Sequence, residues 1–178
     1  MVQNRSELEE ALRGRLGAAF ARHAYGMRRW VELFAARLPS ITDPEIHRLV
    51  AQIVADNASH AELFRRRALA HGVDPDGYRC SPEGEAVYAR LEPLELREAL
   101  AYALGSLEHF AELLDLYAGL AEDEADRAVL EQVRSENERS IARLRERVRN
   151  GGETAASAAH ELYRLRELAE APRYAGAH

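Results

Sequence analysis

The chain has 178 residues, of which 47% are hydrophobic and 30% charged, and it carries a formal net charge of −6. This composition suits one domain with one core, and it argues against a disordered chain and against nucleic acid as a partner. Cys80 is the only cysteine, so an intrachain disulfide is excluded. We expect a cytoplasmic protein without a signal peptide or a membrane-spanning segment.

The first half of the chain predicts a helical hairpin over residues 6–72. A capping box that begins at Ser6 opens a helix, which keeps its helical periodicity to about Leu38. A second helix begins near Asp43 and ends at Gly72. Because a short turn joins the two helices, we expect them to lie antiparallel.

The second half predicts another hairpin, over residues 94–150. A crossover with a turn and a short helix, residues 73–93, separates the hairpins, and a C-terminal helix covers residues 154–170. We therefore predict a single all-α domain, in which an antiparallel four-helix bundle carries the C-terminal helix on its outside.

The two halves match each other without a gap at a spacing of 80 residues. Gln52 and Gln132 form one identical pair, and Asn57 and Asn137 form another. Turn residues and core residues keep the same register, which indicates a duplicated hairpin. We expect the two hairpins to superpose by a rotation about the bundle axis.

The second helix of each hairpin has an apolar stripe that becomes polar at one level. Asn57 and His60 interrupt the first stripe, and Asn137 and Ser140 interrupt the second. A buried polar group without a partner costs about 1–3 kcal/mol, so this level is a candidate site.

The segment from Asp56 to Phe64, with the sequence DNASHAELF, resembles the second helix of rubrerythrin-type and other ferritin-like proteins. The resemblance covers about residues 6–149. It implies a Glu-x-x-His motif on helices 2 and 4 and one Glu on each of helices 1 and 3, which together hold two metal ions. The rival fold is a seven-helix, haem-oxygenase-like arrangement, because Asp56-x-x-x-His60 also resembles the motif of those di-iron oxidases.

The ligands that the resemblance implies are mostly replaced in this chain. The two motifs read Asn57-x-x-His60 and Asn137-x-x-Ser140. Distance from the turns places Tyr25 and the neighbourhood of Gly105 at the other two positions. Two hard cations need about four carboxylates, so we expect neither a di-metal centre nor another cofactor. Iron or manganese is the less favoured alternative.

Two carboxylates beside the altered motifs leave a mononuclear metal site open. Asp56 and Glu136 each precede one of the asparagines, and they could bind one ion together with His60, His23 and Glu108. We favour the reading in which Asp56 and Glu136 lie on helix flanks and face solvent or a neighbouring helix, because charged side chains are seldom buried unpaired.

We expect the polar level to bind, or to transform, a small organic molecule without a metal. His60 is the candidate acid or base, and His23 is the second catalytic candidate. In contrast, His47, His71 and His109 are expected at the surface or at helix ends. The candidate substrate-binding residues are Asn57, Asn137, Ser140 and Tyr25.

Two other functions remain open for a bundle of this kind. One is a ferritin-like, metal-dependent oxidoreductase with an altered ligand set. The other is a non-catalytic subunit that binds a paralogue. We expect the chain to form a homodimer unless such a paralogue is its partner.

Overall fold

The computed structural model describes residues 4–148 and 152–176, and all regular structure in these ranges is helical. The prediction of an all-α chain is therefore confirmed. The elements are α1 (Arg5–Leu12), α2 (Leu16–Ala35), the 3-10 helix η1 (Leu38–Ser40), α3 (Pro44–Ala70), α4 (Pro82–Leu91), α5 (Leu96–Leu120), α6 (Glu124–Val148), α7 (Glu153–Glu170) and the 3-10 helix η2 (Ala171–Gly176). The predicted end of the second hairpin at residue 150 lies outside the described residues. Within the described ranges, no helix has the length and the apolar character that crossing a membrane requires.

The helix starts keep the 80-residue spacing. α2 begins at Leu16 and α5 at Leu96, and the same spacing separates the starts of α3 and α6. Asp43 caps α3, since its Oδ1 accepts the backbone N–H of Glu45 at 2.8 Å. Asp123 does the same for α6, with the N–H of Ala125 at 2.7 Å. Each aspartate satisfies a donor that an isolated helix end would leave unpaired.

The first predicted helix is broken into two, which corrects the expectation of one helix from Ser6 to Leu38. Gly14 has φ of 71°, a left-handed conformation that ends α1 and lets the chain turn before α2. The cap of α1 is Asn4 and not Ser6, because Asn4 Oδ1 accepts the N–H of Glu7 at 3.0 Å. The first hairpin therefore consists of α2 and α3, and α1 contacts η2 and α5 instead.

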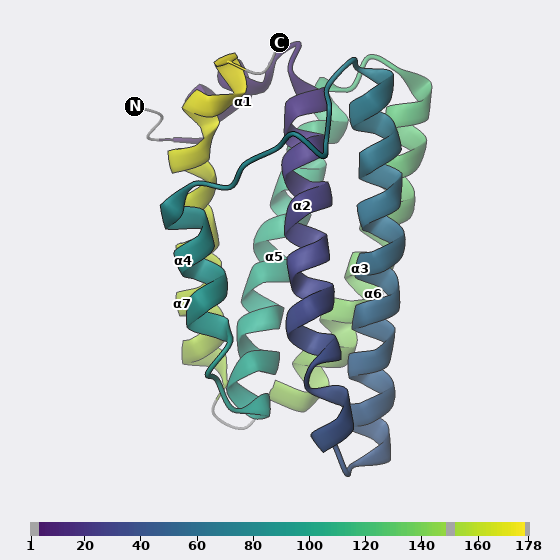
Figure 1. Cartoon of the computed structure of the whole chain (residues 1–178), viewed down its shortest axis with the longest axis vertical. Coiled ribbons are helices and arrows are strands. Elements are labelled where there is room, and N and C mark those ends of the chain that lie inside the picture. Colours follow the sequence, from purple (N-terminus) through teal and green to yellow (C-terminus); the bar gives the residue numbers. More distant parts are fainter. Residues whose placement is uncertain (1–3, 149–151, 177–178) are drawn as a thin grey trace.

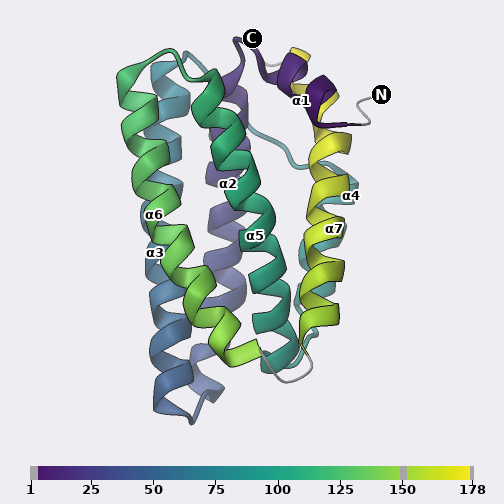
Figure 2. The same ribbon diagram turned by 180° about the vertical axis from the view of Figure 1, so that it is seen from behind.

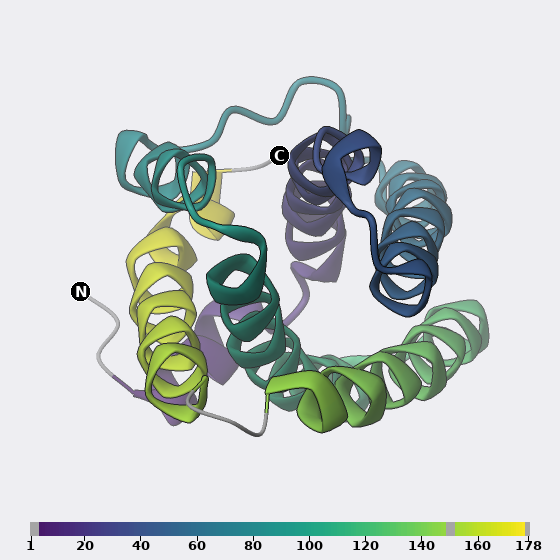
Figure 3. The same ribbon diagram turned by 90° about the horizontal axis from the view of Figure 1, so that it is seen from below.

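Apart from the short α1, the α-helices form two layers of three. Figure 3 shows α4, α2 and α3 on one side and α7, α5 and α6 on the other. α2 packs along α3, and α5 packs along both α6 and α7. The second layer is in front in Figure 2. α4 runs back along the bundle after α3, so that α5 runs parallel to α3 (Figure 1).

The C-terminal helix α7 is part of the core, which corrects the expectation that it packs outside a finished bundle. Seven of its residues are buried, and four of these carry a polar group. A Cβ on Gly105 of α5 would lie 1.9 Å from the carbonyl oxygen of Ala156, so the glycine allows the two backbones to approach this closely. The buried side chains of α7 with a polar group are Tyr163, Arg166, Glu167 and Glu170.

Polar residues separate two apolar clusters along the bundle. On α3, Ile53 belongs to one cluster and Phe64 to the other, with His60 between them in the sequence. On α6, Val133 and Leu144 belong to different clusters in the same way. The polar level that the sequence indicates therefore lies inside the bundle, between two packed regions.

Candidate functional site

Two matched contacts join α3 to α6 at the polar level. Nε2 of His60 lies 2.6 Å from Oε2 of Glu136. The Ser140 hydroxyl donates to Oδ2 of Asp56 at 3.4 Å. Ser140 lies 80 positions after His60, and Asp56 lies 80 positions before Glu136. The 80-residue repeat therefore relates the two contacts to each other. α3 and α6 run in opposite directions (Figure 1). The rotation axis that relates the two hairpins is therefore perpendicular to the bundle axis, which corrects the expected rotation about the bundle axis.

Asp56 and Glu136 are half-buried and turned towards the partner helix, which is the second of the two orientations expected for these flank residues. Gln52 donates to Asp56 at 2.7 Å, and Gln132 donates to Glu136 at 3.3 Å. Burial alone would raise the pKa of Glu136, but hydrogen bonds from His60 and Gln132 lower it. An ionised Glu136 only accepts hydrogen bonds, so the proton of the pair lies on Nε2 of His60.

Both asparagines of the polar level bond to main-chain oxygens. The amide of Asn57 donates to the Ile53 carbonyl at 2.8 Å, and the amide of Asn137 donates to the Leu107 carbonyl at 3.0 Å. A small cavity of about 30 Å³ lies between them, with room for about two water molecules. The structure thus brings four of the predicted site residues to one space, namely Asn57, His60, Asn137 and Ser140.

A second cavity, of about 60 Å³, lies between α2, α5 and α7. Asn57, Met27, Leu107 and Phe110 border both cavities. His23 borders only the second, so it does not share the space that His60 borders. The other polar side chains of the second cavity are Arg22, Ser106, His109, Tyr163, Arg166 and Glu167, with Tyr88 and Trp30 beside them.

His23 is buried and neutral. Burial, reinforced by Arg22 and Arg166, holds the pKa of His23 well below its usual range. Nε2 of His23 lies 3.4 Å from an Arg22 nitrogen and 2.8 Å from the Tyr117 hydroxyl. Since arginine only donates, Nε2 accepts, and His23 is unsuited to act as a general acid near neutral pH.

The lowered pKa of His23 predicts an acid-sensitive fold. A histidine with a depressed folded-state pKa takes up its proton on unfolding, so its effect is absent above about pH 6.5 and grows as the pH falls. Unfolding by urea should show a loss of about 1.4 kcal/mol per pH unit from this group between pH 6 and 5. His23→Gln should remove this contribution and leave that of the buried His109, whereas His47→Gln, an exposed control, should leave the slope unchanged. An unchanged slope in His23→Gln would contradict the assignment.

A buried ion pair ties α7 to α2. Arg22 pairs with Glu167, and Arg22 Nε also donates to the Tyr174 hydroxyl at 2.7 Å. That hydroxyl donates in turn to Glu167 at 2.6 Å. The positive charge of Arg22 is therefore neutralised within the protein.

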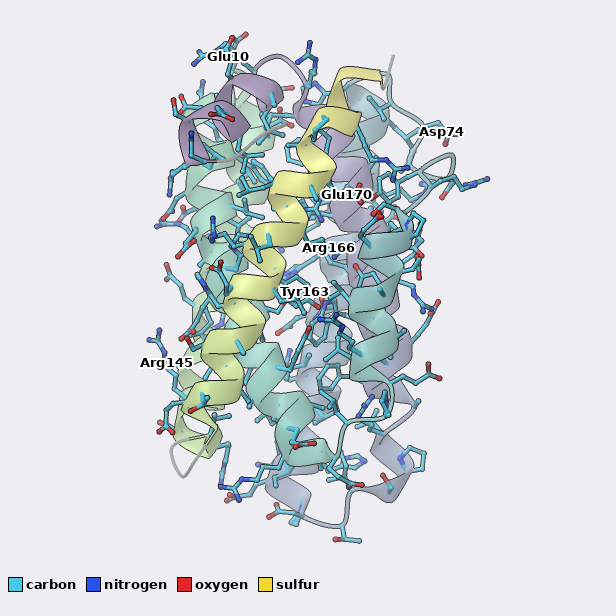
Figure 4. The ribbon with its side chains drawn as sticks, turned by 90° about the vertical axis from the view of Figure 1, so that its left-hand side faces the viewer. Glu10, Asp74, Arg145, Tyr163, Arg166 and Glu170 are labelled. Atoms are coloured by element: carbon cyan, nitrogen blue, oxygen red, sulfur yellow. The ribbon has the colours of Figure 1, made fainter. Side chains whose placement is uncertain are left out.

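Arg166 lies one residue before Glu167 and has no such neutralisation. Its side chain is 6% exposed, and it forms no ion pair with a carboxylate in the described part of the chain. One terminal nitrogen lies 3.5 Å from Cys80 Sγ, and the guanidinium lies 4.8 Å from the centre of the Tyr88 ring. Arg166 Nε has no hydrogen-bond partner among the described residues, whereas the Tyr163 hydroxyl lies beside that of Ser106. Figure 4 shows the side chains of Arg166 and Tyr163 on the side of α7 turned towards α4.

Tyr25 and Gly105 face away from the polar level. The Tyr25 hydroxyl donates to Glu85 of α4, and its ring lies 5.4 Å from that of Tyr78. Gly105 faces α7, as described above. Tyr25 therefore borders neither cavity, and its expected role in substrate binding is corrected. The residues of α2 and α5 that do border the cavity at His60 are apolar, and the repeat relates two of them, Met27 and Leu107.

The remaining histidines divide between surface and core. His47 is exposed and His71 caps the end of α3, as expected. His109, in contrast, is buried in α5, and burial lowers its pKa to about 4, which corrects its expected surface position. Within residues 4–148 and 152–176, one trio of His, Cys, Asp or Glu side chains has ligand atoms all within 4.8 Å of one another. This trio is His109, Glu112 and His160, and none of the carboxylates expected around His60 belongs to it.

Comparison of the chain with protein-family models, with curated proteins and with solved structures finds no match. A function can therefore be inferred only from the residues and the geometry of the site. Sequence reasoning missed Arg22, Arg166 and Glu167, since helical periodicity places charged residues on a solvent-facing side unless a partner helix is known. The one available signal was that α7 carries glutamates and arginines in the same stretch as its leucines.

Proposed function

We propose that this chain is a ferritin-like bundle protein that binds a small organic anion in the cavity between α2, α5 and α7. No metal takes part in this binding, and His60 with Glu136 is the acid or base beside it. The single observation that carries the proposal is Arg166, a buried guanidinium that borders the cavity without an ion-pair partner in the described part of the chain.

An anion would remove an energetic cost that the protein alone leaves in place. A buried charge without a partner costs several kcal/mol, and a carboxylate can accept two parallel hydrogen bonds from one guanidinium. The Tyr163 hydroxyl lies beside that of Ser106, and both side chains border the same cavity, where they can donate to an anion. Arg22 is already neutralised by Glu167, so Arg166 is the cation that an anion in this cavity would neutralise.

The size of the cavity limits the ligand class. A cavity of about 150 Å³ holds a benzene ring, whereas this one measures about 60 Å³. A short carboxylic acid, or the carboxylate end of a somewhat longer one, suits that volume. Met27, an unbranched and adaptable side chain, lies on the border with the cavity at His60, so a longer ligand would extend in that direction.

The helix order supports the ferritin-like part of the proposal. α4 carries the chain back along the bundle between two antiparallel pairs, as the single crossover of ferritin-like bundles does (Figure 1). The kept 80-residue spacing favours this duplicated hairpin over the seven-helix rival. Met27 and Leu107 border the cavity of His60 where carboxylates would have to point for a di-metal site, and this favours the metal-independent reading over the oxidoreductase.

Arg166→Met separates ligand binding from stability. If Arg166 serves a ligand, methionine should raise the free energy of unfolding by about 1 kcal/mol, because it removes an unpaired buried charge. Calorimetric titration with formate, acetate and benzoate should show saturable one-to-one binding of at least one acid to the unaltered protein. Its affinity should fall at least about tenfold in Arg166→Met, since a charge-assisted hydrogen bond contributes about 1.5–3 kcal/mol.

The control for this experiment is Arg145→Met, which removes an exposed arginine paired with Glu108 and should keep the binding. Equal binding by both variants, or a destabilised Arg166→Met without any carboxylate binding to the unaltered protein, would contradict the proposal. His60→Gln tests the acid or base role. The variant should still bind the anion, whereas loss of binding would show that His60 contacts the ligand.

The homodimer and the paralogue partner remain predictions. The large apolar side chains most exposed in the described part of the chain are Leu69 on α3 and Leu165 on α7. Leu165, at 51% exposure, fits the expectation of a C-terminal leucine left uncovered. Single exposed leucines are common on monomers, so neither favours an interface.

A further inference from the structure

We infer that His109, Glu112 and His160 form a binding site for one divalent transition-metal ion, such as zinc, between α5 and α7. The site is distinct from the positions at which the ferritin-like resemblance implies metal. It also differs from the anion site proposed above, because Arg166 takes no part in it, although His109 borders that cavity.

The three side chains already stand at ligand spacing. Oε1 of Glu112 lies 3.0 Å from Nε2 of His160, and Oε2 lies 3.7 Å from Nδ1 of His109. Zinc bonds of about 2.0–2.2 Å in a tetrahedral site place neighbouring donor atoms about 3.3 Å apart. An ion therefore fits among them after small side-chain movements. Two imidazoles and one carboxylate are a ligand set suited to zinc or to ferrous iron.

The backbone contact between α5 and α7 sets this spacing. Gly105 and Ala156 meet one helical turn before His109 and His160, respectively. Because α5 and α7 run parallel, the next turn of each helix brings the two imidazoles together, with ring centres 5.5 Å apart. Glu112 follows His109 by three residues and so lies on the same face of α5.

The buried histidine supplies a second, independent observation. His109 is 5% exposed, and neither of its ring nitrogens has a hydrogen-bond partner among the described residues. A buried polar group in that condition costs about 1–3 kcal/mol, so it needs an explanation. A metal ion on one ring nitrogen provides a partner of the kind that imidazole prefers.

The outer side of the trio is open to solvent. The side chain of His160 is 27% exposed and that of Glu112 is 51% exposed. An ion can therefore enter without unfolding the helix pair. Three protein ligands also leave a coordination position for water, as in catalytic zinc sites.

Zinc titration of the untagged, full-length protein tests the site, with a chromophoric chelator as competitor and cobalt(II) as a spectroscopic reporter of geometry. We expect one equivalent of zinc per chain. His160→Gln should weaken zinc binding at least about 100-fold and Glu112→Gln at least about tenfold, because each removes a direct ligand. A parallel anaerobic titration with ferrous iron shows which of the two metals binds more tightly.

His47→Gln is the matched control, because it removes an exposed histidine outside the trio and should leave zinc binding unchanged. Both trio variants change partly exposed side chains, so circular dichroism should show them folded. Absence of stoichiometric zinc binding, or zinc binding that survives His160→Gln, would overturn the inference. Arg166→Met should keep the zinc, and His160→Gln should keep the carboxylate, so failure of one proposal is distinguishable from failure of the other.

Discussion

Glu167→Gln is expected to lower the free energy of unfolding by about 3–5 kcal/mol. The substitution removes the only carboxylate that pairs with Arg22 in the described part of the chain, and it leaves a guanidinium inside the core. Urea unfolding at pH 7, followed by circular dichroism, measures the loss. The Tyr174 hydroxyl would remain beside Arg22, but a neutral acceptor compensates a buried charge poorly.

Two further variants show whether the loss comes from the unpaired charge. Arg22→Met combined with Glu167→Leu removes both charges and should recover most of the stability, since apolar replacements of a buried pair are often neutral or stabilising. Glu131→Gln breaks an exposed pair with Arg134 and should leave stability unchanged. If Glu167→Gln behaves like Glu131→Gln, the buried pair does not hold α7 in place.

Gly105→Ala is expected to cost about 3 kcal/mol and to loosen α7. The added Cβ would lie 1.9 Å from the Ala156 carbonyl oxygen, which belongs to the backbone and cannot move without its helix. Overpacking of a tight core costs about 1–3 kcal/mol, and a clash with backbone falls at the upper end. Thermal unfolding gives the magnitude, and amide hydrogen exchange should show faster exchange confined mostly to α7.

Gly119→Ala is the matched control on the same helix. A Cβ there has no neighbour within 4 Å, so alanine should stabilise α5 by roughly 0.5–1 kcal/mol through its higher helix propensity. Opposite signs for the two substitutions would show that the cost at Gly105 is steric. A stabilising Gly105→Ala would mean that α7 does not approach α5 this closely in solution. Zinc binding should also weaken in Gly105→Ala, because the same contact places His160 beside His109.

Arg22 and Arg166 show two outcomes for buried arginines in one core. Arg22 has both a carboxylate and a hydroxyl, and its charge is satisfied within the fold. Arg166 has the ring and the hydroxyl of Tyr88 and a sulfur, which are neutral and weaker partners for a desolvated cation than a carboxylate. This difference is the reason to treat the first as a structural tie and the second as a ligand contact.

Part of this fold could be predicted from local chemistry alone. The aspartate caps before α3 and α6, Pro44 in the first turn and the glycine after α3 are all readable in sequence, because each acts on its own few residues. The repeat also fixed the depth of Asn57, His60, Asn137 and Ser140, and the structure places these four around one small cavity. Gly14 was the local signal that was missed, because one glycine did not interrupt the hydrophobic periodicity of its neighbours.

What the sequence by itself determined is therefore the helices, their duplication and the level of the polar residues. Only the tertiary structure decided which way each helix faces. Counting residues from a turn gives height along a helix but no rotation about its axis, so Tyr25 and Gly105 were placed at the right depth on the wrong side. The partners of α7 were hidden for a related reason. Glu167 is stable inside the core because Arg22, far away in the chain, is there to neutralise it, and no local pattern records that contact.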